Sequence, residues 1–98
     1  MAFLIETFDK PESYALRLEH RNEHLKYLDE NVNLLLACGA KLSDDGTTAS
    51  GGIYLVDVDS RQSAQHFIEA DPFYKAGLFS DVKIKRWRKA YFNFKNTL

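Results

Sequence analysis

One aspartate lies where the helical pattern around it calls for an apolar side chain. Ala64, Phe67 and Ile68 occupy positions i, i+3 and i+4 of a predicted helix, and Asp71 follows at i+7. This spacing puts Asp71 on the stripe that faces the core. It is also near the C-terminal end of that helix, where the helix dipole disfavours a negative charge by ~0.3–1 kcal/mol. We therefore predict a paired, functional carboxylate. The alternative is that Asp71 turns outward or caps the turn at Pro72.

A histidine on the preceding predicted helix is the natural partner for this carboxylate. Four residues there follow at i, i+4, i+7 and i+11 and share a stripe about 60° wide: Arg17, Arg21, His24 and Leu28. A carboxylate on one imidazole nitrogen fixes the tautomer and makes the other nitrogen a better general base. The arginines would favour an anionic substrate group, or an enolate or phenolate that forms during the reaction. We predict a catalytic His24–Asp71 pair with two substrate-binding arginines; the plainer alternative is a solvated helix edge.

Other candidates for chemistry are weaker. His20 and His24 have the i, i+4 spacing of a two-histidine metal site, but no third ligand is evident, so we predict neither a metal nor a cofactor. The single cysteine, Cys38, follows an apolar run and is expected to be an inert, buried thiol. Tyr14 and Tyr54 are expected to pack rather than to act as acids.

Length and composition limit the function classes. The 98 residues suit one domain, and a formal net charge of −1 provides no overall field to attract nucleic acid or an anionic membrane. The chain has no apolar run of the ~20 residues that a membrane span needs, and its N-terminus does not resemble a signal peptide. A single cysteine allows no internal disulfide, which fits a reducing cytoplasm. We expect a cytoplasmic protein without a membrane partner.

The C-terminal segment combines charge with aromatic side chains. Between Lys83 and Lys95, six basic residues alternate with Trp87 and three further aromatic residues. Such a segment could bind nucleic acid by charge and stacking. An edge strand protected by lysines, followed by an aromatic dimer contact, is the simpler interpretation. We therefore predict no nucleic-acid partner.

The elements that must position the candidate residues alternate between strand and helix patterns. The chain reads as a strand at 2–8, an amphipathic helix at about 12–32, a strand at 34–42 with a bend or bulge at Gly39, a strand at 53–58, a helix from the cap at Ser60 to about 70, and a last strand from about Val82. In the first helix, five apolar residues fall within about 80° of one another: Tyr14, Leu18, Leu25, Leu28 and Val32. The order β-α-β-β-α-β predicts an α+β, ferredoxin-like fold: a four-stranded antiparallel sheet with both helices on one face.

Two helices cover only one face of such a sheet. The other face would expose leucine, tyrosine, valine and tryptophan side chains in a monomer, and an apolar patch of that size usually marks an interface. We therefore expect a homodimer in which the two sheets face each other.

Several segments together resemble the YCII family of small dimeric α/β proteins. The likeness covers about residues 2–87 and rests on these pieces: Arg17-x3-Arg21-x2-His24-Leu25, Gly51-Gly52, Ala70-Asp71-Pro72-Phe73, Ala76-Gly77-Leu78 and Val82-Lys83-Ile84 before Trp87. The resemblance implies a ferredoxin-like dimeric α+β barrel and a pocket in which His24 and Asp71 are paired, and we expect Gly52 to join the arginines in binding substrate. The best-understood chemistry of the YCII family is proton abstraction from a hydroxylated ring with loss of a halide, in which the histidine is the base. This sequence departs from the family in two places. The second strand reads ACGAKLSDDG where many relatives have Gly-Pro near its end, and aromatic residues extend the C-terminus past Trp87. We expect one domain over residues 1–98, with 88–98 as an extension.

The function predicted from these residues is a small enzyme of lyase or isomerase type. The His24–Asp71 pair would act as general base on a small organic, phenolic or anionic molecule. The alternative is a dimeric, non-catalytic module that binds a small ligand or serves as an accessory domain. A cofactor-independent monooxygenase is a third candidate, which rests on fold analogy alone.

Overall fold

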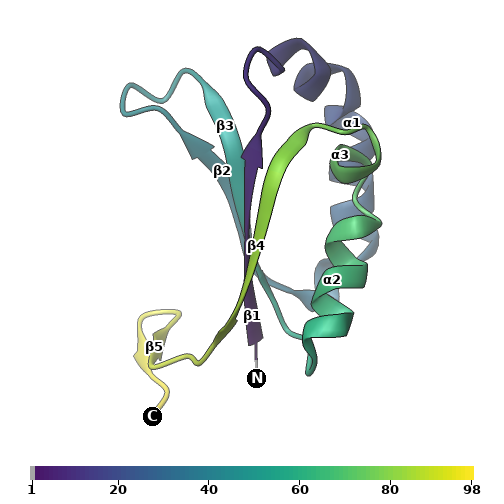
Figure 1. Cartoon of the computed structure of the whole chain (residues 1–98). Helices are drawn as coiled ribbons and strands as arrows, with labels where there is room; N and C mark the ends of the chain where they lie inside the picture. Colours follow the sequence, from purple (N-terminus) through teal and green to yellow (C-terminus); the bar gives the residue numbers. More distant parts are fainter. Residues whose placement is uncertain (1) are drawn as a thin grey trace.

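The computed structural model describes residues 2–98 and has the predicted alternation of strands and helices (Figure 1). The main elements are β1 (Ala2–Asp9), α1 (Tyr14–Glu30), the 3₁₀ turn η1 (Val32–Leu34), β2 (Leu35–Leu42), β3 (Ala49–Val56), α2 (Arg61–Glu69), α3 (Pro72–Lys75) and β4 (Phe79–Trp87). A small hairpin of β5 (Tyr91–Phe92) and β6 (Lys95–Asn96) follows.

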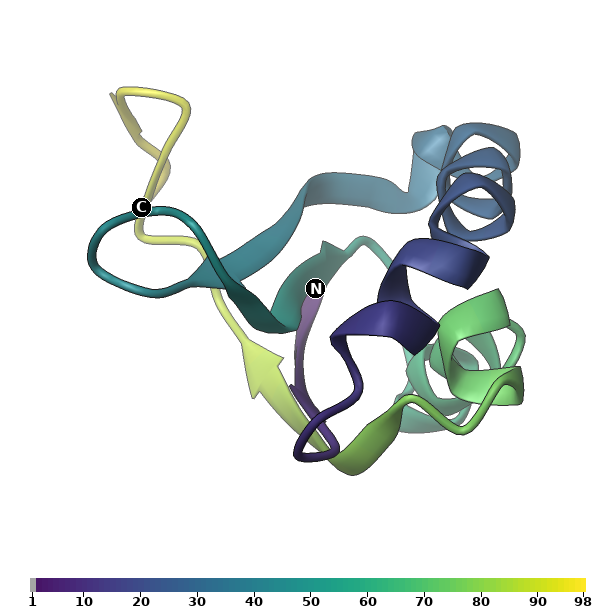
Figure 2. The same cartoon turned by 90° about the horizontal axis from the view of Figure 1, so that it is seen from above.

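Four strands form one antiparallel sheet in the order β2-β3-β1-β4. All three helices lie on one face of this sheet, and the other face is left open by residues 2–98 (Figures 1 and 2). This is the ferredoxin-like arrangement that the sequence predicts, so the fold prediction is confirmed.

The core lies between α2 and the two central strands. Phe3 and Ile5 of β1 and Tyr54 and Val56 of β3 alternate toward the helices, as the two-residue period of a strand requires. From α2, the predicted apolar positions fill the other side: Ala64, Phe67 and Ile68, each at most 5% exposed. Ser60 caps this helix as expected, because its hydroxyl accepts a hydrogen bond from the Ser63 amide at 3.0 Å.

Helix α1 corrects one prediction. It runs over Tyr14–Glu30 rather than 12–32, and of its predicted apolar stripe Leu28 alone among residues 2–98 packs against the core. Leu18 is 55% exposed and Val32, beyond the helix end, is 64% exposed. The helix is turned instead so that the stripe carrying Arg17 and His24 faces the sheet, because side chains on that stripe have polar partners on other elements.

Three strand and loop boundaries also differ from prediction. β3 spans Ala49–Val56 rather than the predicted 53–58. It begins earlier because Gly51 and Gly52 pair with β1 as part of the strand. In β2, register shifts occur near Leu36 and after Lys41, not at Gly39. The connection after Pro72 contains the short helix α3.

The open face of the sheet carries a mixed surface. Leu4, Leu55 and Trp87 lie there beside the charged residues Glu6, Lys83 and Lys85. Tyr54 and Val56 lie on the covered face, so the expected tyrosine and valine are absent from the open one. Among residues 2–98, no helix combines the length and the apolar character needed to cross a membrane.

Candidate active site

Asp71 lies at the junction of α2 and α3 and is fully buried. The backbone leaves the helical region there, since φ is −66° and ψ is 130°, as expected for a residue before proline. Its Oδ1 accepts a hydrogen bond from the Phe73 amide at 2.8 Å, so Asp71 is the N-cap of α3. Asp71 therefore caps the turn at Pro72, as one of the two predictions had it, and this role does not exclude a paired carboxylate.

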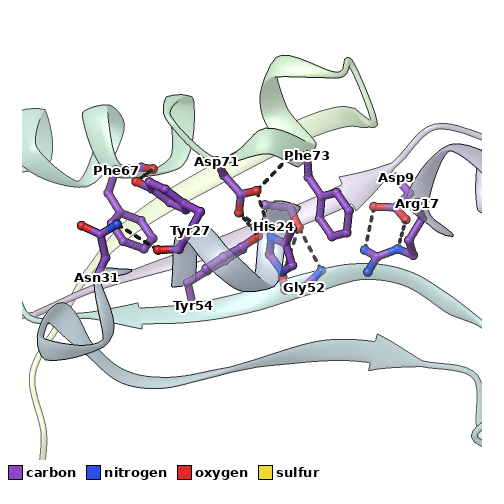
Figure 3. A network of polar contacts seen from close by, with 11 residues as sticks. Asp9, Arg17, His24, Tyr27, Asn31, Gly52, Tyr54, Phe67, Asp71 and Phe73 are labelled. Atoms are coloured by element: carbon purple, nitrogen blue, oxygen red, sulfur yellow. Dashed lines mark hydrogen bonds and ion pairs between the residues drawn. The ribbon is translucent and has the colours of Figure 1, made fainter. Parts of the chain in front are cut away.

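His24 of α1 meets this carboxylate directly (Figure 3). Its Nδ1 lies 2.9 Å from both Oδ1 and Oδ2 of Asp71, and its side chain is 11% exposed. The imidazole stacks on the Phe73 ring, with centroids 4.0 Å apart and planes 12° from parallel. No group within residues 2–98 hydrogen-bonds to Nε2. One ring nitrogen is therefore held by the carboxylate, and the other makes no hydrogen bond within residues 2–98.

Tyr54 of β3 is a third member of this network, whereas it was expected only to pack. Its hydroxyl donates to Asp71 Oδ2 at 2.9 Å, and the residue is 2% exposed. Burial, then the charge of Asp71 and the hydrogen bond to it, raise the pKa of the phenol well above its ordinary value of 10.0. Tyr54 is thus a fixed donor to Asp71 rather than an acid. The available signal was strand alternation, which places Tyr54 on the same face as Gly52.

The two arginines of α1 have different surroundings. The Arg17 guanidinium forms two hydrogen bonds to Asp9, at 2.8 and 3.1 Å, and lies 4.9 Å from the centre of the Phe73 ring. Asp9 therefore compensates the charge of Arg17, a partner that spacing along one helix could not reveal. Arg21 forms no hydrogen bond or ion pair within residues 2–98.

A cavity of about 210 Å³ brings the predicted residues together between α1 and strands β2 and β3. Its lining includes Arg17, Arg21, His24, Tyr54 and Phe73, together with Gly51 and Gly52. Such a volume is below the ~300 Å³ at which pockets for drug-sized ligands begin, and suits a small molecule.

Gly51 and Gly52 of β3 line the cavity without a side chain. A Cβ on Gly51 would lie 2.0 Å from the Thr7 carbonyl oxygen, so no side chain fits there. A Cβ on Gly52 would lie 3.3 Å from the Gly39 carbonyl oxygen. The Gly52 amide donates to the Thr7 hydroxyl at 2.9 Å, so what Gly52 contributes to the cavity is space.

Cys38 corrects another prediction, because it is exposed rather than buried and lines the same cavity. Burial, followed by the charge of Asp71, raises the pKa of the thiol to about 11. The thiol is therefore protonated at neutral pH, which disfavours nucleophilic attack.

The second histidine of α1 lies apart from the site. The His20 nitrogens are 3.0 Å from Glu19 and 3.6 Å from Glu23 on the helix surface. Within residues 2–98, no three His, Cys, Asp or Glu side chains are grouped as metal ligands.

Comparison with known proteins gives a consistent result. The model of the YCII-related domain matches residues 1–88. Protein YciI of Escherichia coli is 29% identical over 98 aligned positions, which cover 93% of this chain and all of that protein.

Two solved structures show the same fold. The 5-chloro-2-hydroxyhydroquinone dehydrochlorinase TftG of Burkholderia phenoliruptrix, in complex with 2,5-dihydroxybenzoquinone, superimposes with a TM-score of 0.84. It is 32% identical, with 90% of this chain and 94% of that chain covered. A candidate antibiotic biosynthesis monooxygenase of Bacteroides thetaiotaomicron has a TM-score of 0.58 at 13% identity, with coverages of 97% and 93%, and shares the fold alone.

Proposed function

This chain belongs to the family of YCII-related domains, and on that premise we propose that its His24–Asp71 pair is the general base of a small lyase or isomerase. The observation that carries the proposal is the contact of Nδ1 with both Asp71 oxygens at 2.9 Å, which leaves Nε2 for a substrate. A carboxylate in this position holds the Nδ1 proton and stabilises the imidazolium that forms when Nε2 accepts a second proton.

The proposed reaction consists of proton transfers between the substrate ring and His24 Nε2. A ring hydroxyl loses its proton to His24 Nε2, and the electron pair stays on oxygen as a phenolate. Return of the proton from Nε2 to a ring carbon gives the keto tautomer, which is an isomerase step. Where that carbon carries a halide, the halide anion leaves to solvent while a second hydroxyl gives its proton to the regenerated Nε2, and this loss of hydrogen halide completes a lyase step.

Arg21 is the cation that we propose for the phenolate. It lines the cavity and has no protein partner within residues 2–98, so its charge is available to a bound anion. Arg17 also lines the cavity, and its pairing with Asp9 suits it to binding a neutral hydroxyl while it supports the Phe73 ring. Gly52 is proposed to admit the substrate ring, since a side chain there would occupy the cavity wall.

The substrate class is taken from the similar dehydrochlorinase. TftG acts on a chlorinated hydroxyhydroquinone, which is a single ring with several hydroxyl groups. A cavity of about 210 Å³ beside a histidine base and an unpaired arginine suits a polyhydroxylated ring of this kind. We propose a polyhydroxybenzene, with or without a halide, as the substrate.

The remaining proposals concern assembly. We propose a single domain over residues 1–98, with 88–98 as an extension, in a cytoplasmic homodimer. The open face of the sheet supports the homodimer, because Leu4, Leu55 and Trp87 lie on it and no element of residues 2–98 covers it (Figure 2).

The experiment is an assay of chloride release and quinone formation from 5-chloro-2-hydroxyhydroquinone, with keto–enol conversion followed for its unchlorinated parent. His24→Ala and Asp71→Asn should each lower the rate by ~10²–10⁴-fold. His20→Ala is the matched control, because this ring lies on the same helix but contacts only surface glutamates. Wild-type rates in His24→Ala would refute the general base.

A non-catalytic module that binds small ligands would give a different result. Ligand would be recovered unchanged, and His24→Gln would keep most of the affinity. A monooxygenase would lose activity without oxygen, whereas the proposed reaction consumes none.

A further inference from the structure

The C-terminal arm, residues 89–98, lies beyond the part of the chain that matches the family model. It forms the β5–β6 hairpin, which projects from the end of β4 on the open side of the sheet (Figure 1, yellow). The hairpin has only two residues in each strand. A two-stranded hairpin by itself is marginally stable in water, so its order depends on packing against something else.

The arm finds little of that packing within its own chain. The Phe92 ring meets Trp87 edge to face, with ring centroids 6.5 Å apart, and the Lys89 ammonium lies 5.3 Å from the centre of the same ring. Tyr91 is 71% exposed and Phe94 is fully exposed. Phe94 also has a φ of 63°, a left-handed conformation that is costly for a bulky residue. Phe94 thus presents its aromatic ring outward from the two-residue turn of the hairpin.

The charge of the arm matches a second projection on the same side of the molecule. The arm carries Lys89 and Lys95, directly follows Arg88, and contains no acidic side chain. The loop between β2 and β3, residues 43–48, carries Asp44 and Asp45 and no basic side chain. In Figure 1 this loop projects from one end of the sheet and the arm from the other, both on the open side.

An apolar residue lies next to the acidic loop. Leu42 ends β2 immediately before the loop and is 56% exposed. An aromatic side chain that docks there would cover apolar surface that the chain leaves in water. Asp45 also keeps its charge, because hydrogen bonds from Ser43 and Thr47 hold the pKa of its carboxyl below the usual range.

Symmetry then selects the partner. A face-to-face dimer has its two-fold axis in the plane of the interface. An axis parallel to the strands would place acidic loop on acidic loop, and basic arm on basic arm. An axis across the strands places the arm of each copy on the loop of the other, so that opposite charges meet twice.

We propose that the C-terminal arm of one copy docks on the β2–β3 loop of a second copy, with Lys89 and Lys95 facing Asp44 and with Tyr91 and Phe94 covering Leu42. This inference rests on the homodimer proposed above but not on the chemistry of the pocket.

The test uses complementary charge reversal in the full chain. Asp44→Lys reverses the loop charge that is proposed to face the arm, and Lys89→Glu with Lys95→Glu makes the arm acidic. Each variant alone sets like charges against each other at both contacts, so its dimer dissociation constant in sedimentation velocity should rise about tenfold or more. An equimolar mixture should form a heterodimer of near wild-type affinity, because both of its contacts join opposite charges.

The control is Lys26→Glu with Lys75→Glu, which changes the net charge as much as the arm variant does but at exposed positions on α1 and α3. It should leave the dimer unchanged. If the arm and loop variants dimerise like this control, or if their mixture shows no recovery, the arm–loop contact is refuted while the homodimer stands. A wild-type chain that stays monomeric would refute both. Turnover measured on the same samples separates either result from the fate of the His24–Asp71 proposal.

Discussion

The two long helices lie on the same face of one sheet, yet they are held to it in different ways. Helix α2 buries Ala64, Phe67 and Ile68 against the central strands. Helix α1 buries no residue fully. Tyr27 and Leu28 pack against the edge of the core. Polar contacts join the helix as well: the Tyr27 hydroxyl donates to the Phe67 carbonyl at 2.7 Å, and His24 binds Asp71.

This difference explains where the cavity is. A helix packed through apolar side chains leaves no room beneath it, and α2 closes the core over β1 and β4. Helix α1 packs mainly against α3, and the space between it and β2 and β3 remains as the cavity. The helix that contributes least to the core is therefore the one that supplies His24, Arg17 and Arg21.

The sharpest test of this contrast is a matched pair of truncations. Ile68→Ala in α2 removes a fully buried side chain and should lower the free energy of unfolding by about 2–5 kcal/mol. Leu18→Ala in α1, at 55% exposure, should change it by no more than about 0.5 kcal/mol. Urea denaturation measures both, and equal losses would show that α1 is a core helix after all.

Asp71 follows α2 and contacts His24 of α1. Its replacement should lower the free energy of unfolding by less than a core truncation does. In Asp71→Asn an amide group faces donors that the carboxylate accepted, from His24, Tyr54 and the Phe73 amide. We expect a loss of about 1–3 kcal/mol in urea denaturation. Asp57→Asn, at an exposed position, is the control. An Asp71 variant as stable as this control would mean that the contact does not form in solution.

Loss of the hydrogen bond from Tyr27 to Phe67 should lower the free energy of unfolding by a smaller amount, which depends on pH. Tyr27→Phe should cost about 0.5–1.5 kcal/mol, and Tyr14→Phe, on an exposed ring of the same helix, should cost nothing measurable. Burial and then the charge of Asp71 raise the pKa of Tyr27 from 10.0 to about 12. Because the folded pKa is the higher one, this contribution is fully present below pH 10 and is lost as the pH rises toward 12. Denaturation curves for wild type and Tyr27→Phe should therefore converge across that range.

Cys38 reports on the cavity without affecting stability. Since the thiol is exposed but has a pKa of about 11, its alkylation by iodoacetamide should be slow at pH 7 and should rise with pH until about 11. A rate that levels off near pH 8.5 would show an ordinary surface thiol and a cavity more open than the structure has it.

The sequence predicted the α2 side of the molecule well, because apolar periodicity records apolar packing. Ala64, Phe67 and Ile68 are buried, and Asp71 on the same stripe is buried with them. The same method failed for α1, whose orientation is set by the partners of polar side chains. Helical spacing correctly placed Arg17 and His24 on one stripe, but it took the neighbouring apolar stripe for the core face.

The unpredicted members of the site come from elsewhere in the chain. Asp9 reaches Arg17 from the end of β1, and Tyr54 reaches Asp71 from β3. Contacts between residues on different elements depend on strand register, which local patterns do not specify. The register also explains why Gly51 and Gly52 belong to β3 rather than to a loop: they pair with Phe8 and Thr7 of β1.

In the proposed site, Asp71 holds the proton of His24 on Nδ1, so that Nε2 is the acceptor facing the cavity. Nitrogen-15 NMR of the His24 ring measures this tautomer directly, at a pH where the ring is neutral. We predict a protonated Nδ1 and an unprotonated Nε2 in the wild-type protein, and a mixture of tautomers in Asp71→Asn. A proton found on Nε2 in the wild type, or a tautomer that Asp71→Asn leaves unchanged, would contradict the account.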